Sequence, residues 1–256
     1  IKQNKKWIIC GVLGDPCTAK DLIPIIDYII THNPQADISV ETNGGIRSTL
    51  WWKEFGKLTS KIYNLNVIFS IDGLSDTNHI YRRNVQWDKV IENLTAFTSS
   101  GGNATWQFIR FRHNEHQVTE AKDLAKQLGV KNFKVKETNR FRKIHENEHK
   151  YPVRSLGSES VDYWIYPPNS FQPKALTNIN LNNTTISCLA QTRKEIYVNA
   201  KGMVYPCCFI FSDTQENVNF YESLDLNLLQ VTKSRSLKEI IESDFFGYIE
   251  DSWSKT

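Results

Sequence analysis

The chain contains few of the residues and patterns that mark membrane, secreted or strongly basic proteins. Its 256 residues include one methionine and five cysteines, and its formal net charge is only +3. No apolar run reaches the roughly 18–20 residues that a membrane-spanning helix needs. The apolar stretch at residues 7–11 is too short for the hydrophobic segment of a signal peptide. We therefore expect no membrane partner, and this modest charge gives no clear sign of a nucleic-acid partner.

The cysteines suit a reducing compartment better than a secreted disulfide scaffold. Their number is odd, and two of them, Cys207 and Cys208, are adjacent. We therefore expect a cytoplasmic protein whose cysteines serve a metal or a reaction. The chain opens on Ile1 instead of methionine, so we also expect the natural protein to extend upstream.

Short apolar runs alternate with segments of helical period over residues 1–137. The helical segments carry apolar side chains at i, i+3 and i+4, as in Leu22, Ile25 and Ile26. Such alternation is typical of right-handed βαβ crossovers and predicts an α/β fold with a parallel sheet. Binding sites of such sheets gather at the carboxyl ends of the strands. The expected strands are residues 7–11, 38–42, 67–72, 105–111 and 133–135.

The remainder of the chain follows a different pattern. Residues 138–187 are rich in Asn, Pro, Ser and charged side chains, which favours an extended connector with some packed aromatic residues. Residues 195–199 and 203–206 flank a turn at Gly202 and predict a β-hairpin. A final helix is expected to begin at Ser236. We therefore divide the chain into residues 1–137, 138–187 and 188–256.

Two glycines and a carboxylate follow the first expected strand, in the segment Gly11-Val-Leu-Gly14-Asp15-Pro16. The glycines let the backbone approach a ligand closely, and Asp15 places a carboxylate at the strand end. The segment lacks the Gly-Lys-Ser/Thr of a P-loop and the spacing of a dinucleotide fingerprint. A tight turn with Asp15 as a helix cap explains the pattern equally well, so Gly14 and Asp15 are candidates for either role.

Polar side chains also end the second and third expected strands. Side chains alternate along a strand, so Ser70 and Asp72 share one face, where a buried parallel strand is normally apolar. This pair favours a ligand with ribose-like hydroxyl groups; a helix cap plus a hydroxyl bonded to the backbone is the alternative. Thr42 and Asn43 end the neighbouring strand on opposite faces.

Two arginines follow the same alternation in the fourth expected strand. Arg110 and Arg112 share one face with Trp106 and Phe108. If the arginines point into the cavity, their planar guanidinium groups can hold a ligand carboxylate in a bidentate pair. If they point outward, they are solvated, and the sequence leaves both orientations open.

Three of the cysteines lie around the expected hairpin, in the pattern Cys188-x13-Gly202-x4-Cys207 followed by Cys208. Two cysteines brought together across a hairpin favour a thiolate metal site, and without CxxC pairs a zinc ribbon fits poorly. Adjacent cysteines rarely ligate one metal together, so we expect Cys207 to be the ligand and Cys208 to lie in the core. Buried free cysteine is the alternative for the whole set.

The two remaining cysteines lie near the first expected strand. We expect Cys10 in the core, because it lies inside that strand, and Cys17 beside the cavity at the strand ends. Their spacing matches no metal motif.

Taken together, these motifs resemble the radical S-adenosylmethionine (SAM) enzymes with a SPASM or twitch-type C-terminal extension. Leu13-Gly14-Asp15-Pro16 resembles the family's Gly-Gly-Glu-Pro-like segment, which holds the SAM amino group. Thr42-Asn43-Gly44 resembles the end of the next strand of that family, and Ser70 and Asp72 resemble its ribose contacts. The Cys188–Cys207 pattern is similar to the opening of the family's auxiliary-cluster motif.

The resemblance implies a partial (β/α)6 barrel lacking its first strand, followed by a SPASM-like hairpin and helix. It implies SAM, a [4Fe–4S] cluster and an auxiliary iron–sulfur cluster with Cys188 and Cys207 as ligands. Arg110 or Arg112 would take the SAM carboxylate. The full protein would generate a 5′-deoxyadenosyl radical that abstracts hydrogen from an unidentified substrate, such as a peptide or protein. An electron donor such as flavodoxin or ferredoxin is implied as a partner.

The sequence departs from the family pattern at both ends. The CxxxCxxC motif that holds the SAM-binding cluster is absent from the printed chain, and no cysteine follows Cys208. We therefore expect a fragment that is inactive by itself. The alternative is a cluster-free barrel that binds a peptide or nucleotide without catalysis. A hydrolase is disfavoured, because no catalytic triad order or metal–histidine cluster stands out.

Overall fold

The computed structural model describes residues 5–11, 14–142, 144–145, 148–155, 157–173, 188–208, 226–232 and 235–254. Leu13 and residues 174–187 of the expected connector lie outside these ranges. Internal contacts divide the chain into one unit over residues 1–175 and a second over residues 176–256. Among the described residues, no helix combines the length and apolar character that a membrane crossing requires.

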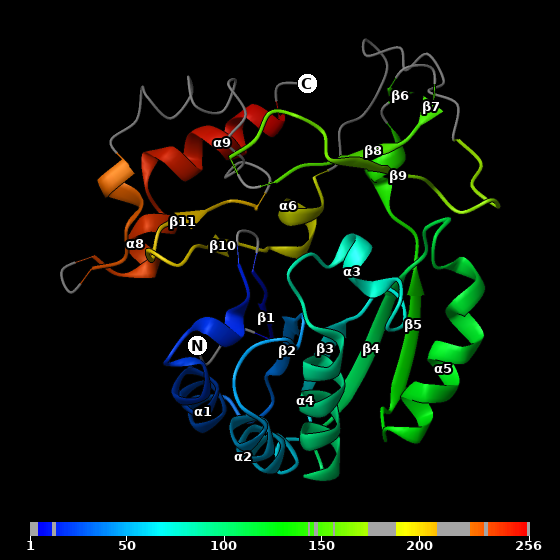
Figure 1. Ribbon diagram of the computed structural model, residues 1–256. Coiled ribbons are helices and arrows are strands. Elements are labelled where there is room, and N and C mark those ends of the chain that lie inside the picture. Colours follow the sequence, from blue (N-terminus) through cyan, green and yellow to red (C-terminus); the bar gives the residue numbers. More distant parts are fainter. Residues whose placement is uncertain are drawn as a thin grey trace. The chain divides into compact units, whose positions relative to one another are not determined.

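The first unit is built on a five-stranded parallel sheet, as the alternating pattern predicts. The strands pair in chain order, and every pairing is parallel (Figure 1). Each overlaps an expected strand, with ends shifted by a few residues. The strands are β1 (Lys6–Ile9), β2 (Asp37–Thr42), β3 (Leu65–Ser70), β4 (Ala104–Ile109) and β5 (Asn132–Lys136).

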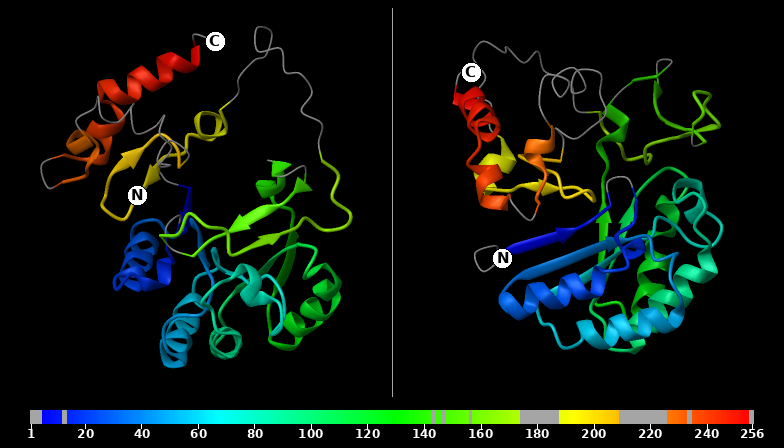
Figure 2. Two further views of the ribbon diagram at one scale, coloured as in Figure 1. Left: turned by 45° about the horizontal axis from the view of Figure 1, so that its top comes forward. Right: turned by 90° about the vertical axis from the view of Figure 1, so that its left-hand side faces the viewer.

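Helices cover one face of this sheet, as Figures 1 and 2 show. An aromatic cluster that includes Trp52, Phe55, Phe69 and Phe97 packs between the sheet and the helices. Gly56 lies where α2 (Thr49–Thr59) meets α4 (Trp87–Ser99), and its lack of a side chain lets these two helices pack closely. The connecting helices are the short η1 (Pro16–Thr18), α1 (Leu22–His32), α2 (Thr49–Thr59), α3 (Asn78–Tyr81), α4 (Trp87–Ser99), η2 (Glu115–Gln117) and α5 (Val118–Gln127).

The opposite face of the sheet is more polar. Ser39, Glu41 and Asn66 are half-buried there, and the Thr105 hydroxyl donates to Asn66 Oδ1 over 2.9 Å. At the carboxyl end of β4 this face carries a second apolar cluster, which comprises Ile109, Phe111, Phe141, Val153 and Ile165. The polar face and the strand ends therefore offer the side chains from which a site can be built.

Two small antiparallel hairpins follow β5 where the sequence predicts only an extended connector. The pattern does not reveal them because strands of two or three residues are too short to show a period. The elements are η3 (Asn139–Arg142), β6 (Ile144–His145) paired with β7 (Glu148–His149), and β8 (Tyr151–Val153) paired with β9 (Tyr163–Ile165).

The second unit contains the expected hairpin. Gly202 has a positive φ of 77° in its turn, the left-handed conformation that glycine adopts most readily. The expected final helix is divided: Ser236 and Glu239 form a capping box at the start of α8, and α9 begins at Asp244. The elements are α6 (Leu189–Arg193), β10 (Tyr197–Val198), β11 (Val204–Tyr205), η5 (Leu226–Leu229), α8 (Leu237–Ile241) and α9 (Asp244–Ser254).

The contact of α2 with α4 predicts that Gly56→Ala is destabilising. A Cβ at Gly56 would lie 2.5 Å from the Phe97 carbonyl oxygen, so the helices must separate at a cost of about 1–3 kcal/mol. Gly247→Ala is the matched control: Gly247 is also helical and its Cβ would meet nothing within 4 Å, so a gain of up to about 1 kcal/mol is expected. Urea unfolding followed by circular dichroism measures both, and a Gly56→Ala protein as stable as the parent would contradict this packing.

Candidate functional site

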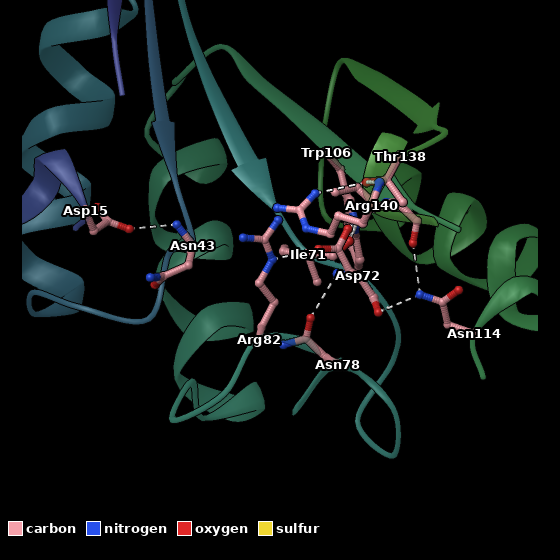
Figure 3. Close-up of polar contacts among 11 residues, drawn as sticks. Asp15, Asn43, Ile71, Asp72, Asn78, Arg82, Trp106, Asn114, Thr138 and Arg140 are labelled. Atoms are coloured by element: carbon pink, nitrogen blue, oxygen red, sulfur yellow. Dashed lines mark hydrogen bonds and ion pairs between the residues drawn. The ribbon is translucent and has the colours of Figure 1, made fainter. Parts of the chain in front are cut away.

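Asp15 connects the turn after β1 to the end of β2. Its carboxylate accepts hydrogen bonds from the Cys17 amide (2.9 Å) and the Asn43 amide (2.8 Å). The Thr42 hydroxyl lies 3.0 and 2.9 Å from its two oxygens. Figure 3 shows the bond to Asn43 at the strand end. Asp15, Thr42 and Asn43, which the sequence predicts as site residues, are therefore brought together.

The helix-cap role expected for Asp15 is confirmed, because its side chain caps η1. A carboxylate offers about four lone-pair positions, and besides the two amides and the Thr42 hydroxyl the Cys17 thiol also hydrogen-bonds to Asp15. Gly14 adds room beside it, since a Cβ at that position would meet nothing within 4 Å. Because Asp15 is only half-buried, a small cationic group such as an ammonium can still approach its carboxylate.

Cys17 lies beneath Asp15 and is fully buried. Burial raises the pKa of its thiol to about 12, and hydrogen bonding with Thr42 opposes that rise. At neutral pH the side chain is thus a protonated thiol, which is a poor metal ligand and nucleophile. Cys10 lies beyond the end of β1 and is exposed, so its expected place in the core is wrong.

Ser70 and Asp72 lie at the end of β3 in different environments. Ser70 is nearly buried, and its hydroxyl makes no hydrogen bond within the described part of the chain. Asp72 is fully buried, with Oδ1 accepting the Ile109 amide and Oδ2 accepting Arg82 Nε, both over 2.6 Å. Burial raises the pKa of Asp72, and the Arg82 guanidinium opposes the rise. Both carboxylate oxygens therefore already have protein partners.

A buried amide network surrounds Asp72 and fixes the ends of β3 and β4 (Figure 3). The Asp72 amide donates to Asn78 Oδ1 over 2.9 Å. Asn114 Nδ2 donates to the carbonyls of Asp72 (2.8 Å) and Ile109 (3.0 Å). Sequence reasoning missed Asn78, Arg82 and Asn114; the available signal was a set of polar residues in the loops that follow two neighbouring strands.

The structure does not bring Arg110 and Arg112 to this cluster. Arg110 forms an ion pair with Glu137 on β5's carboxyl side, with Nε 3.0 Å from Oε1. Arg112 is exposed, and its guanidinium lies 4.8 Å from the Tyr166 ring centroid. Among the described contacts neither guanidinium meets Asp15, Ser70 or Asp72.

In the second unit, Cys188 and Cys207 are half-buried free thiols, and Cys188 precedes α6. Cys208 is exposed, so its expected place in the core is wrong. Across the described ranges, no three or more His, Cys, Asp or Glu side chains are grouped to hold a metal ion. Two thiols fit an iron–sulfur site in ligand type but do not complete one.

Comparison with known proteins gives fold similarity only. No protein-family model matches the sequence, and no curated protein matches it. The crystal structure of Streptococcus suis SuiB aligns with a TM-score of 0.52 and 15% identity, covering 89% of this chain and 56% of SuiB. SuiB bound to its precursor peptide SuiA aligns with a TM-score of 0.51 and 16% identity, over 91% of this chain and 56% of that one.

The chain thus spans a little over half the length of these SuiB structures. At such low identity the likeness concerns the fold: an α/β unit with a five-stranded parallel sheet and small hairpins that resembles the radical SAM partial barrel. SuiB bound to SAM aligns over a shorter stretch, 55% of this chain, with a TM-score of 0.45, too low to support an argument.

The burial of the cysteines predicts their order of alkylation. Cys10 is exposed and should react with iodoacetamide at pH 8 within minutes, whereas exposed Cys208 should react more slowly because burial raises its pKa. Cys17, with its pKa raised to about 12, should remain unmodified in the native protein, because the thiolate is the reactive form. Peptide mapping by mass spectrometry measures each site, and unfolding in urea should abolish the difference. Alkylation of native Cys17 as fast as Cys10 would contradict the described site.

The environment of Asp72 predicts that Arg82→Met costs far more stability than the loss of an exposed ion pair. Removing Arg82 leaves a buried carboxylate without its counter-charge, at a cost of about 3–5 kcal/mol. Glu137→Gln removes the exposed partner of Arg110 and should cost less than about 1 kcal/mol. Denaturant unfolding compares them, and equal losses would rule out a buried ion pair at Asp72.

Proposed function

We propose that the carboxyl edge of the sheet binds SAM as part of a radical SAM enzyme that acts on a peptide or protein. The observation that carries this proposal is the convergence of Asp15, Thr42 and Asn43 beside Gly14. They meet at the strand ends of a parallel sheet, where such folds bind ligands, and that sheet resembles the one in SuiB.

Asp15 is assigned to the SAM ammonium, because its carboxylate is only half-buried and lies next to open space at Gly14. Thr42 and Asn43 orient its carboxylate from the end of β2. Ser70 is assigned to a ribose hydroxyl, since its own hydroxyl has no partner in the described part of the chain. Asp72 is fully buried and each of its oxygens already has a protein donor, so it is assigned to positioning the strand ends instead of the ribose contact that the motif suggests.

The SAM carboxylate is assigned to Arg112 in preference to Arg110. This assignment requires the Arg112 side chain to turn toward Asp15, because the SAM ammonium and carboxylate are bonded to the same carbon and no described contact joins the two residues. Arg110 already pairs with Glu137, whereas Arg112 has no carboxylate partner among the described residues and lies over Tyr166. A guanidinium held flat on a ring retains its N–H edge for a bidentate carboxylate contact.

The proposal also includes the metal centres of the family. A [4Fe–4S] cluster would supply the electron that cleaves SAM; the printed chain has no CxxxCxxC motif to hold it. Cys188 and Cys207 would hold an auxiliary cluster in a SPASM-like region over residues 188–256, with a flavodoxin or ferredoxin as electron donor. A peptide substrate is proposed because SuiB, which shares the fold, was crystallised with its precursor peptide SuiA.

The proposal is tested by titrating SAM into the anaerobically reconstituted protein. The protein is expressed together with any residues that its gene encodes on either side of the printed sequence. Asp15→Ala should weaken SAM binding at least about tenfold, because a hydrogen bond to a charged group is lost. Asp21→Ala is the matched control, since Asp21 is an exposed carboxylate next to α1 whose side chain makes no capping bond. Cys188→Ala should also lower the bound iron.

Two outcomes would count against the proposal. Absence of both bound iron and SAM binding would leave the cluster-free binding module as the better interpretation. Equal SAM affinity in Asp15→Ala and Asp21→Ala would remove Asp15 from the site even if SAM binds.

A further inference from the structure

Two arginines share a single tyrosine at the carboxyl edge of the sheet. The guanidinium carbons of Arg82 and Arg140 lie 5.1 and 5.2 Å from the Tyr81 ring centroid. Arg140 also lies 5.7 Å from the centroid of Tyr151 on β8. Figure 3 shows Arg82 and Arg140 approaching Asp72 from α3 and η3, two elements that are far apart in the sequence. The protein therefore concentrates two like charges in one place.

The positive charge at this place exceeds the negative charge. Asp72 is the only carboxylate that the described contacts give to the pair, and it bonds Arg82. Arg140 has no carboxylate bond within the described residues. By contrast, the adjacent Arg83 is paired with Asp162 over 2.8 Å. One positive charge beside Tyr81, that of Arg140, is therefore not balanced by a carboxylate among the described contacts.

The guanidinium groups also retain unused donors. Arg82 uses Nε for Asp72, and Arg140 uses Nη1 for the Thr138 hydroxyl over 3.0 Å. Neither the Nη atoms of Arg82 nor Nε and Nη2 of Arg140 make a hydrogen bond in the described part of the chain. Arg140 is exposed, and the Arg82 side chain is 24% exposed. These N–H groups are accessible to a ligand.

Stacking on the tyrosines holds the donors in place before a ligand arrives. Arg140 is fixed by two rings and by Thr138, and Arg82 is fixed by the buried Asp72. Ordering these long side chains in advance lowers the entropy that binding must overcome. Burial raises the pKa of Tyr81 above its ordinary value even though both guanidiniums oppose this, so its hydroxyl stays protonated beside them.

We propose that Arg82 and Arg140 form a carboxylate-binding subsite that takes the side chain of an Asp or Glu residue of a peptide substrate. Planar guanidinium edges match a planar carboxylate, and one carboxylate balances the single surplus charge. The subsite rests on the proposed function for a peptide as the substrate, and it narrows that substrate to an acidic peptide. The carboxylate contact itself does not depend on SAM.

NMR titration of the full protein with acetyl-Gly-Glu-Gly-amide, in the absence of SAM, tests the subsite. The Arg82 and Arg140 Nε–H signals should shift, whereas the corresponding Gln peptide should leave them unchanged. Arg140→Gln should weaken binding at least about tenfold, and Arg140→Lys, which keeps the charge but loses the fork, should bind with intermediate affinity. Arg83→Gln is the control, because Arg83 lies over Tyr163 and already has a carboxylate partner.

Arg140 is the residue to change because it is exposed and, unlike Arg82, makes no hydrogen bond to the buried Asp72, so its variants should fold. Equal affinity of Arg140→Gln and Arg83→Gln for the Glu peptide would overturn the proposal. The proposal would also be overturned if inorganic phosphate bound more tightly than the Glu peptide and displaced it, since the subsite would then select phosphate. If the Glu peptide binds as expected and SAM does not, the subsite stands and the proposed function fails.

Discussion

The buried carboxylate of Asp72 is the constraint on which the carboxyl edge of the sheet depends. A charge without solvent must find its partners inside the protein, and here they are the Ile109 amide on β4 and Arg82 just after α3. That requirement joins β3 to β4 and positions the loop between β3 and α4. It also orients Tyr81, and through it the guanidinium of Arg140.

Two carboxylates at the same sheet edge have acquired different roles through their surroundings. Asp72 is enclosed, and both of its oxygens have donors, whereas Asp15 is only half-buried and lies beside Gly14. The first is therefore a structural charge, and the second is the one that a cationic ligand can still reach. Residue type alone does not distinguish them, because each follows a strand and each could contact a ligand.

The sequence predicts the parallel sheet and its main helices because burial imposes regular apolar spacing on long elements. It also predicts that Thr42 and Asp15 lie at strand ends. The sequence cannot predict which groups bond the Asp72 carboxylate, since Arg82 and Ile109 come close to Asp72 only in the folded chain. The core position expected for Cys10 fails because an apolar neighbour indicates burial only while the strand continues, and β1 ends at Ile9. The core position expected for Cys208 followed only from assigning Cys207 as the ligand, and that assignment does not determine burial.

The short hairpins after β5 give the edge of the sheet its aromatic partners. Tyr151 on β8 packs with Arg140, and Tyr163 on β9 packs with Arg83 while donating its hydroxyl to the Ile80 carbonyl over 2.6 Å. The charged groups thus come from the loops around the sheet, and the surfaces that hold them flat come from the connector. Changes in the connector, the part of the first unit that the apolar pattern predicts least well, can therefore redirect these guanidiniums without disturbing the strands.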